Sequence, residues 1–406
     1  MIHTFSNGLR LVYQERLAPI TYVGIMINKG TRNEPYELNG LAHYVEHTVF
    51  KGTQKFSARQ IINQIEGVGG EINAYTNKEE TAFYAVTPNA HFFKTLEVLC
   101  QMVTAPTFPQ SETQKEVGVI LDEIESYNDA PSELIYDDFE ALIFNHHPLE
   151  KRILGTKKTL QKIASSPLYA QQWVQNQFVA TNMIIFVLGT VSPEKIIRRI
   201  EQLLPSFPTQ NGILEPNKPV MESAATQISY KKHTHQTHCM LGSFGYPYNH
   251  PKQLKLFLLN NILGGGSLNS RLNTRLREKN GLVYTVESQY TPLSDTGYWS
   301  VYFACDNVHY QHCLDLVLGE LKSLRDERLS DASLKKALQQ LRGQLAIASE
   351  NAENNALLMA KQLFYYGFNQ TWEETFEHIA TTTSEELQQI ANEVYAEERL
   401  FFLSYK

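Results

Sequence analysis

The segment TAFYAVTPNAHFFKTLEVL, residues 81–99, recurs in altered form as SVYFACDNVHYQHCLDLVL at residues 300–318. With one gap, the two copies align an aromatic pair, a turn, a histidine and an amphipathic helix in the same order, and each continues into another long helix. Strand–turn–helix units are common, so chance similarity is the alternative explanation. The equal lengths of the two halves favour duplication, and the repeat predicts two related domains in one chain.

The apolar pattern around the repeat is typical of an α+β fold, with a mixed or antiparallel sheet covered by helices in each domain. Prolines interrupt this pattern four times within residues 205–219, which predicts an extended linker. We therefore expect an N-terminal domain at 1–204 and a related C-terminal domain at 220–406. Strands are predicted at 21–28, 71–75, 82–87, 183–188, 225–230, 239–246 and 399–405.

Composition excludes several classes of protein. The 406 residues are 42% hydrophobic and 19% charged, which is enough apolar material for sizeable cores and excludes a disordered or collagen-like chain. A balance of 36 basic against 43 acidic residues gives no electrostatic reason to bind nucleic acid or an anionic membrane. The four cysteines are scattered without a CxxC pair, so no disulfide framework or thiolate metal site is predicted. With no signal-like N-terminus and no apolar run of 18 residues, we expect a cytoplasmic protein.

The segment GLAHYVEHTVFKGT, residues 40–53, carries the clearest chemical pattern. His43 and His47 are four residues apart, so in a helix they share one face and could bind one Zn²⁺. Glu46 could then act as general base toward a water molecule on the metal. The alternative is a pair of ordinary helix histidines, because an isolated HxxEH pattern also arises by chance.

A catalytic zinc needs a third protein ligand. A long helix is predicted from Ser111 onward, and it carries Glu116, Asp122, Glu123 and Glu125. Glu116 and Glu123 are seven residues apart and therefore lie nearly on one face, whereas Asp122 and Glu125 point away from it. Glu116 and Glu123 are the candidate pair.

HYVEH, followed 76 residues after His47 by Glu123, resembles the inverzincin, or pitrilysin/insulinase-type, metallopeptidase family. Within it the chain is similar to the bacterial subgroup that is like the mitochondrial processing peptidase. The resemblance implies one zinc ion per chain, with Glu123 as the third ligand and Glu116 as a supporting acidic residue. It also implies that Glu46 is the general base.

Two further segments extend the resemblance. GGEINAYTNKEETAFY, residues 69–84, is similar to the family's active-site edge strand, which implies that Asn73 and Ala74 bind substrate. An unpaired edge can add an extended peptide as one more strand, although an ordinary hairpin has the same sequence signals. NNILGGGSLNSRLNTRLREKNGLVYTV, residues 260–286, is similar to a glycine-rich loop and an Arg/Tyr pair, here Arg277 and Tyr284.

Arg277 is thereby expected to anchor a peptide carboxylate or carbonyl, and Tyr284 to donate a hydrogen bond to the developing oxyanion. Without the resemblance, a surface arginine and a core tyrosine would be the simpler interpretation.

The second half is not expected to bind metal. An approximate overlay of the halves puts Phe257, Asn260 and Asn261 at the positions of the two histidines and Glu46. The same overlay puts Lys335 and Arg342 opposite Glu116 and Glu123, and cations there exclude a second zinc site of this kind.

Together these features predict a zinc-dependent endopeptidase that hydrolyses peptides or unfolded polypeptide segments. The family resemblance implies that each chain forms half of a clamshell, and because one chain carries both the metal residues and the Arg/Tyr pair, we expect a homodimer with a closed chamber. Neither nucleic acid nor a membrane is an expected partner. Two alternatives remain: a non-catalytic, peptide-binding or structural subunit of a peptidase-like heterodimer, and an enzyme that uses Mn²⁺ or Co²⁺.

Overall fold

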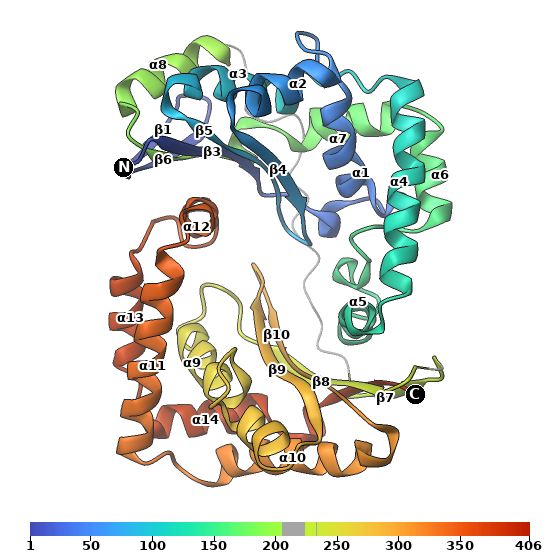
Figure 1. Ribbon diagram of the computed structural model, residues 1–406, viewed down its shortest axis with the longest axis vertical. Coiled ribbons are helices and arrows are strands. Elements are labelled where there is room, and N and C mark those ends of the chain that lie inside the picture. Colours follow the sequence, from blue (N-terminus) through green and yellow to red (C-terminus); the bar gives the residue numbers. More distant parts are fainter. Residues whose placement is uncertain (205–223, 233) are drawn as a thin grey trace. The chain divides into compact units, whose positions relative to one another are not determined.

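The structure is a computed structural model that describes residues 1–204, 224–232 and 234–406. They form two compact units, each built around one β-sheet (Figure 1). The first unit contains Met1–Glu125, the described part of Lys151–Lys218, and Glu350–Asn369. The second contains Ser126–Glu150, the described part of Pro219–Ser349, and Gln370–Lys406. The predicted linker at 205–219 lies outside the described residues.

The first unit has a mixed six-stranded sheet in the order β1-β2-β6-β3-β5-β4. β2 and β6 are parallel and the other neighbours are antiparallel. β4 is an edge strand, because it pairs in the sheet with β5 alone. The bounds are β1 (Ile2–Thr4), β2 (Arg10–Glu15), β3 (Ile20–Ile27), β4 (Glu71–Thr76), β5 (Thr81–Pro88) and β6 (Met183–Gly189).

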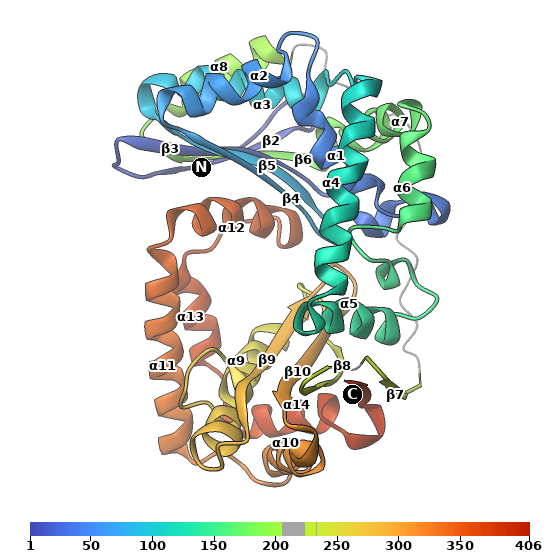
Figure 2. The same ribbon diagram turned by 45° about the vertical axis from the view of Figure 1, so that its right-hand side comes forward.

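The two faces of this sheet are covered by helices from different parts of the sequence. Side chains alternate along a strand, so Val23, Ile25 and Ile27 of β3 join the core beneath one set of helices. Met26 points to the opposite face, where α12 (Ala352–Tyr365) packs; Figure 2 shows α12 on one side of the sheet and α2 and α3 on the other. The first set is α1 (Leu41–Thr48), α2 (Ala58–Ile65), α3 (Phe92–Thr104), α6 (Lys157–Ala164), α7 (Leu168–Gln177) and α8 (Pro193–Leu203), with α4 (Gln110–Asn128) beside α1.

The second unit repeats this plan with a five-stranded sheet in the order β7-β11-β8-β10-β9. Only β7 and β11 are parallel. One face packs against α5 (Pro131–Ile143), and the other against helices of the C-terminal half. The remaining bounds are β7 (Gln227–Tyr230), β8 (Thr237–Gly245), β9 (Val283–Pro292), β10 (Gly297–Cys305), β11 (Phe401–Tyr405), α9 (Gln253–Gly264), α10 (Tyr310–Asp326), α11 (Asp331–Ser349), α13 (Trp372–Ala380) and α14 (Ser384–Val394).

The internal repeat has a counterpart in the order of elements. In the first copy β5 is followed by α3, α4 and α5, and in the second β10 is followed by α10, α11 and α12. α4 and α11 both have 19 residues. α5 is the last helix of the first copy, and it packs against the sheet of the second unit. α12 is the last helix of the second copy, and it packs against the sheet of the first unit. The two halves of the sequence therefore exchange one helix.

The predicted strands are all present within a few residues of their expected ends, and the α+β class is confirmed. Among the described helices, none is long and apolar enough to cross a membrane.

Candidate metal centre

Helix α1 brings His43, Glu46 and His47 together. It has only eight residues, and His43 and Glu46 are among the buried ones. The ring centroids of His43 and His47 lie 4.5 Å apart, as expected for helix positions four residues apart.

Glu123 comes from α4 and completes a three-residue cluster. Its Oε2 atom lies 3.7 Å from Nε2 of His43 and 3.6 Å from Nε2 of His47. A tetrahedral zinc with bonds of about 2.0–2.1 Å separates its ligand atoms by roughly 3.4 Å. The three side chains therefore fit one small divalent metal ion, and they form the one such cluster found among the described residues.

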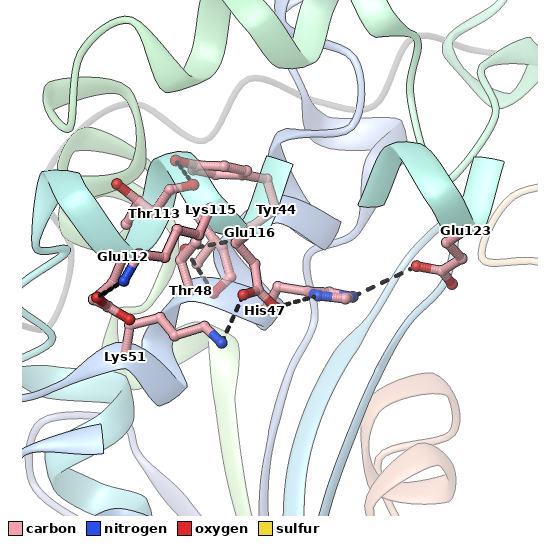
Figure 3. Close-up of polar contacts among 10 residues, drawn as sticks. Tyr44, His47, Thr48, Lys51, Glu112, Thr113, Lys115, Glu116 and Glu123 are labelled. Atoms are coloured by element: carbon pink, nitrogen blue, oxygen red, sulfur yellow. Dashed lines mark hydrogen bonds and ion pairs between the residues drawn. The ribbon is translucent and has the colours of Figure 1, made fainter. Parts of the chain in front are cut away.

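Glu116 orients the ring of His47. Its Oε1 atom lies 3.1 Å from Nδ1 of His47, so Nδ1 carries the proton in this contact and Nε2 is left for a metal. Figure 3 shows His47 between Glu116 on one side and Glu123 on the other. Lys51 lies 2.6 Å from the other oxygen of Glu116. The sequence interpretation found Glu116 and missed Lys51, although Lys51 follows His47 by four residues.

His43 has a different environment. Burial, and secondarily the charge of His47, lower the pKa of His43 to about 3, which keeps the ring neutral as a metal ligand must be. Its Nδ1 atom is buried and has no hydrogen-bond partner in the described part of the chain. Among the side chains that the structure describes, none therefore fixes His43 in the way that Glu116 fixes His47.

Glu46 is placed beside the cluster as a buried carboxyl group. Burial raises the pKa of Glu46, the charge of His47 opposes this effect, and the charge of Glu123 adds to it. Burial likewise raises the pKa of Glu123. Helix α1, which carries Glu46, packs against the edge strand β4, which carries Asn73 and Ala74.

Asn73 and Ala74 lie on β4, where they pair with Tyr84 and Phe83 of β5. None of the described strands pairs with the other edge of β4. The ladder positions needed for an added peptide strand are thus present in the first unit.

Arg277 and Tyr284 belong to the second unit and contact each other there. The guanidinium carbon of Arg277 lies 5.4 Å from the centroid of the Tyr284 ring. Tyr284 is 81% exposed, so the simpler interpretation of a core tyrosine is wrong. The pair is available on the surface of the second unit.

The second unit has neutral amides at the corresponding place. α9 carries Phe257, Asn260 and Asn261, and the Asn261 amide donates to Gln344 of α11 over 3.0 Å. Aligning the first residues of α4 and α11 puts Gln344 opposite Glu123, two residues beyond the Arg342 of the sequence overlay. The ends of helices are defined only to within one or two residues, so the placement of Arg342 opposite Glu123 stays a prediction.

Comparisons with known proteins agree with this arrangement. A family model described as "Insulinase (Peptidase family M16)" matches residues 10–157, which include His43, His47 and Glu123. A second, described as "Peptidase M16 inactive domain", matches residues 169–341.

Relatives match along nearly the whole chain. An uncharacterised zinc protease of Bacillus subtilis is 30% identical over 397 residues, covering 98% of this chain and 96% of the relative. An uncharacterised zinc protease of Rickettsia felis is 30% identical, covering 97% and 95%. A probable mitochondrial-processing peptidase subunit beta of Arabidopsis thaliana is 27% identical, covering 96% and 75%.

Two crystal structures share the fold. One is a protease from Helicobacter pylori, with a TM-score of 0.92, 20% identity, and coverage of 100% of this chain and 99% of the other. The other is described as a peptidase M16 inactive domain from Pseudomonas fluorescens, with a TM-score of 0.90, 20% identity, and coverage of 100% and 97%.

Proposed function

Because this chain belongs to the insulinase-type peptidase family M16, we propose that it is a zinc-dependent endopeptidase acting on peptides and unfolded polypeptide segments. The convergence of His43 Nε2, His47 Nε2 and Glu123 Oε2 beside the buried Glu46 carries this proposal. The rival function, a non-catalytic peptide-binding subunit, predicts damaged ligands, and all three are intact.

His43, His47 and Glu123 would hold the metal, one ion per chain. When bound, zinc would supply a Lewis acid that makes water more acidic and polarises the scissile carbonyl. The same nitrogen and oxygen ligands could also bind manganese or cobalt, so the experiment below uses protein whose metal content has been measured.

Glu46 would move the protons. A carboxylate whose pKa is raised by burial accepts a proton from the attacking water readily, and the resulting acid can pass it to the nitrogen of the leaving amine.

Substrate would bind as an added strand on β4. Backbone hydrogen bonds at Asn73 and Ala74 would align an extended peptide with little demand on its sequence, which favours unfolded segments over folded proteins. Arg277 would anchor a peptide carboxylate or carbonyl, and Tyr284 would donate to the oxyanion. One chain carries both sets of residues, which supports a homodimer with a closed chamber.

Peptide hydrolysis by protein of known metal content tests the function, with Glu46→Gln as the diagnostic variant. We expect Glu46→Gln to bind one zinc ion per chain and to lose nearly all activity, whereas Glu66→Gln, a surface change on the same unit, keeps both. Equal turnover by Glu46→Gln and wild type would refute the mechanism, and wild type that binds no metal would refute the function.

A further inference from the structure

The metal-binding helix begins at a residue that cannot cap it. Gly40 is the N-cap of α1, has a φ of 91° and makes no side-chain capping bond. A Cβ atom at this position would lie 2.9 Å from both the Cα of Gly155 and the carbonyl oxygen of Leu154. The serine, threonine or aspartate that usually accepts the first amide hydrogens of a helix is therefore excluded at position 40.

Glu34 supplies the missing acceptors from six residues upstream. One carboxylate oxygen accepts from the backbone N–H of Gly40 over 2.9 Å, and the other from the N–H of Ala42 over 2.8 Å. The side-chain amide of Asn39 donates to the same carboxylate over 3.1 Å. These bonds satisfy amide hydrogens of the first turn that have no partner within the helix, and a negative charge there is also favoured by the helix dipole.

The segment at Lys151 holds Glu34 in place. The Lys151 ammonium group donates to the carbonyl oxygen of Glu34 over 3.0 Å, and Asn39 donates to the carbonyl oxygen of Arg152 over 2.9 Å. Lys78 in turn donates to the carbonyl oxygen of Lys151 over 2.5 Å. Glu34 is 6% exposed, so its carboxylate has little access to water as an alternative partner.

We propose that Glu34 is a positioning residue for the metal centre, because its carboxylate fixes the first turn of α1 and thereby the place of His43. His43 directly follows Ala42 in that turn, and no side chain of the described chain holds its Nδ1 atom. This inference rests on the proposed function for the presence of the metal. Loss of a helix cap lowers the ratio of folded to unfolded helix by roughly 5- to 30-fold. We expect the zinc affinity of Glu34→Gln to fall by about the same factor.

The effect should depend on pH. Burial raises the pKa of Glu34 to about 7, with the three hydrogen bonds and the charge of Lys151 opposing that rise. Below this pH the wild-type carboxyl is protonated and resembles glutamine, so the ratio of wild-type to variant zinc affinity should approach one. The titratable groups of α1 are His43, Tyr44, Glu46 and His47, and both proteins share them, as they share Lys151 and Lys78.

Competition between the full-length protein and a chromophoric chelator for Zn²⁺, from pH 6 to 8.5, measures this. Glu97→Gln is the matched control, because Glu97 is a buried carboxylate of the same unit that pairs with Lys55, Lys94 and Arg199 away from α1. We expect Glu34→Gln to weaken zinc binding above pH 7 and Glu97→Gln to leave it unchanged. If Glu34→Gln fails to fold, Glu34→Asp keeps the charge with a shorter reach and should also weaken binding.

Equal zinc affinity of wild type and the Glu34 variant across the pH range would overturn the inference, and so would an equal loss in Glu97→Gln or a loss that does not vary with pH. Wild type that binds zinc but hydrolyses no peptide would refute the proposed function. The Glu34 inference would then still be decided by the zinc affinities of wild type and variant. Wild type that binds no zinc would overturn both.

Discussion

Lys51 and Glu116 form an ion pair of 2.6 Å, and the second oxygen of this carboxylate accepts from His47. The side chains of Lys51 and Glu116 are 26% and 11% exposed, so the pair is partly shielded from water. Lys51 therefore acts on the candidate ligand His47 through Glu116.

Substitution of either residue of this pair should weaken metal binding. We expect Glu116→Gln to lower zinc affinity about 10- to 100-fold, as is usual for partners of ligating histidines. Lys51→Met should lower it less, because Glu116 can still accept from His47, and Lys51→Arg should restore it. In a double-mutant cycle measured by chelator competition, the double variant should lose less zinc-binding free energy than the sum of the two single losses. Strictly additive losses would contradict a shared path to His47.

Metal removal should destabilise the first unit. Zinc binds folded protein with a preformed cluster, so at about 100 times its dissociation constant it stabilises by about 2.7 kcal/mol. Thermal unfolding with and without chelator should show this shift. His43→Ala should show none, because it lacks one of the three clustered side chains. The same shift in His43→Ala would indicate binding elsewhere.

Tyr284 should affect turnover more than substrate binding. If its hydroxyl stabilises the oxyanion, Tyr284→Phe lowers kcat by roughly 10² to 10³ with little change in KM. Arg277→Lys should mainly raise KM, because a lysine could not make the bidentate contact that an arginine can make with a peptide carboxylate. Tyr230→Phe, also exposed in the second unit, is the control. A normal kcat in Tyr284→Phe would remove the tyrosine from the mechanism.

The proposed homodimer with a closed chamber predicts both a molecular mass and a substrate preference. Light scattering should give twice 46.4 kDa. Unfolded casein and peptides should be cleaved much faster than folded proteins. A monomeric active enzyme, or one that cleaves folded proteins as readily, would contradict the chamber.

α12 should stabilise the metal-binding unit although it lies in the C-terminal half of the sequence. Leu363 is 2% exposed in the core that includes Met26 and Phe186, so Leu363→Ala should cost about 2–4 kcal/mol. Leu358, on the same helix, is 48% exposed, and Leu358→Ala should cost less than about 0.5 kcal/mol. Hydrogen exchange of β6 amides reports the effect in the first unit. Unchanged protection of β6 in Leu363→Ala would contradict this role of α12.

Much of the fold and of the metal cluster could be predicted from the sequence. Strand alternation located the β-strands, and helical spacing grouped His43 with His47 and Glu116 with Glu123. The family resemblance selected Glu123 as the ligand, and the family is confirmed. Sequence could not reveal Glu34, because its contacts with α1 depend on a backbone path outside that helix.

The helix exchange was likewise beyond the sequence. The apolar stripe of a helix shows that one face is buried, but it does not say which sheet covers that face. In the sequence, α5 and α12 each follow strands of their own half. The simplest expectation is therefore that each helix packs against the sheet of its own half. Only the packing of Ile135 and Phe139 with Tyr405, and of Met359 with Ile184, reveals the exchange.

The exchanged helices bear on how such a chain evolves. If the two halves arose by duplication, the half in whose described residues no metal cluster is found would ordinarily be free to decay or be deleted. Here its helix α12 is part of the core behind the metal-binding sheet, so deletion of that half would strip an apolar surface from the half that was kept. Natural selection for the proposed metal centre would therefore also preserve a half in whose described residues no such cluster is found.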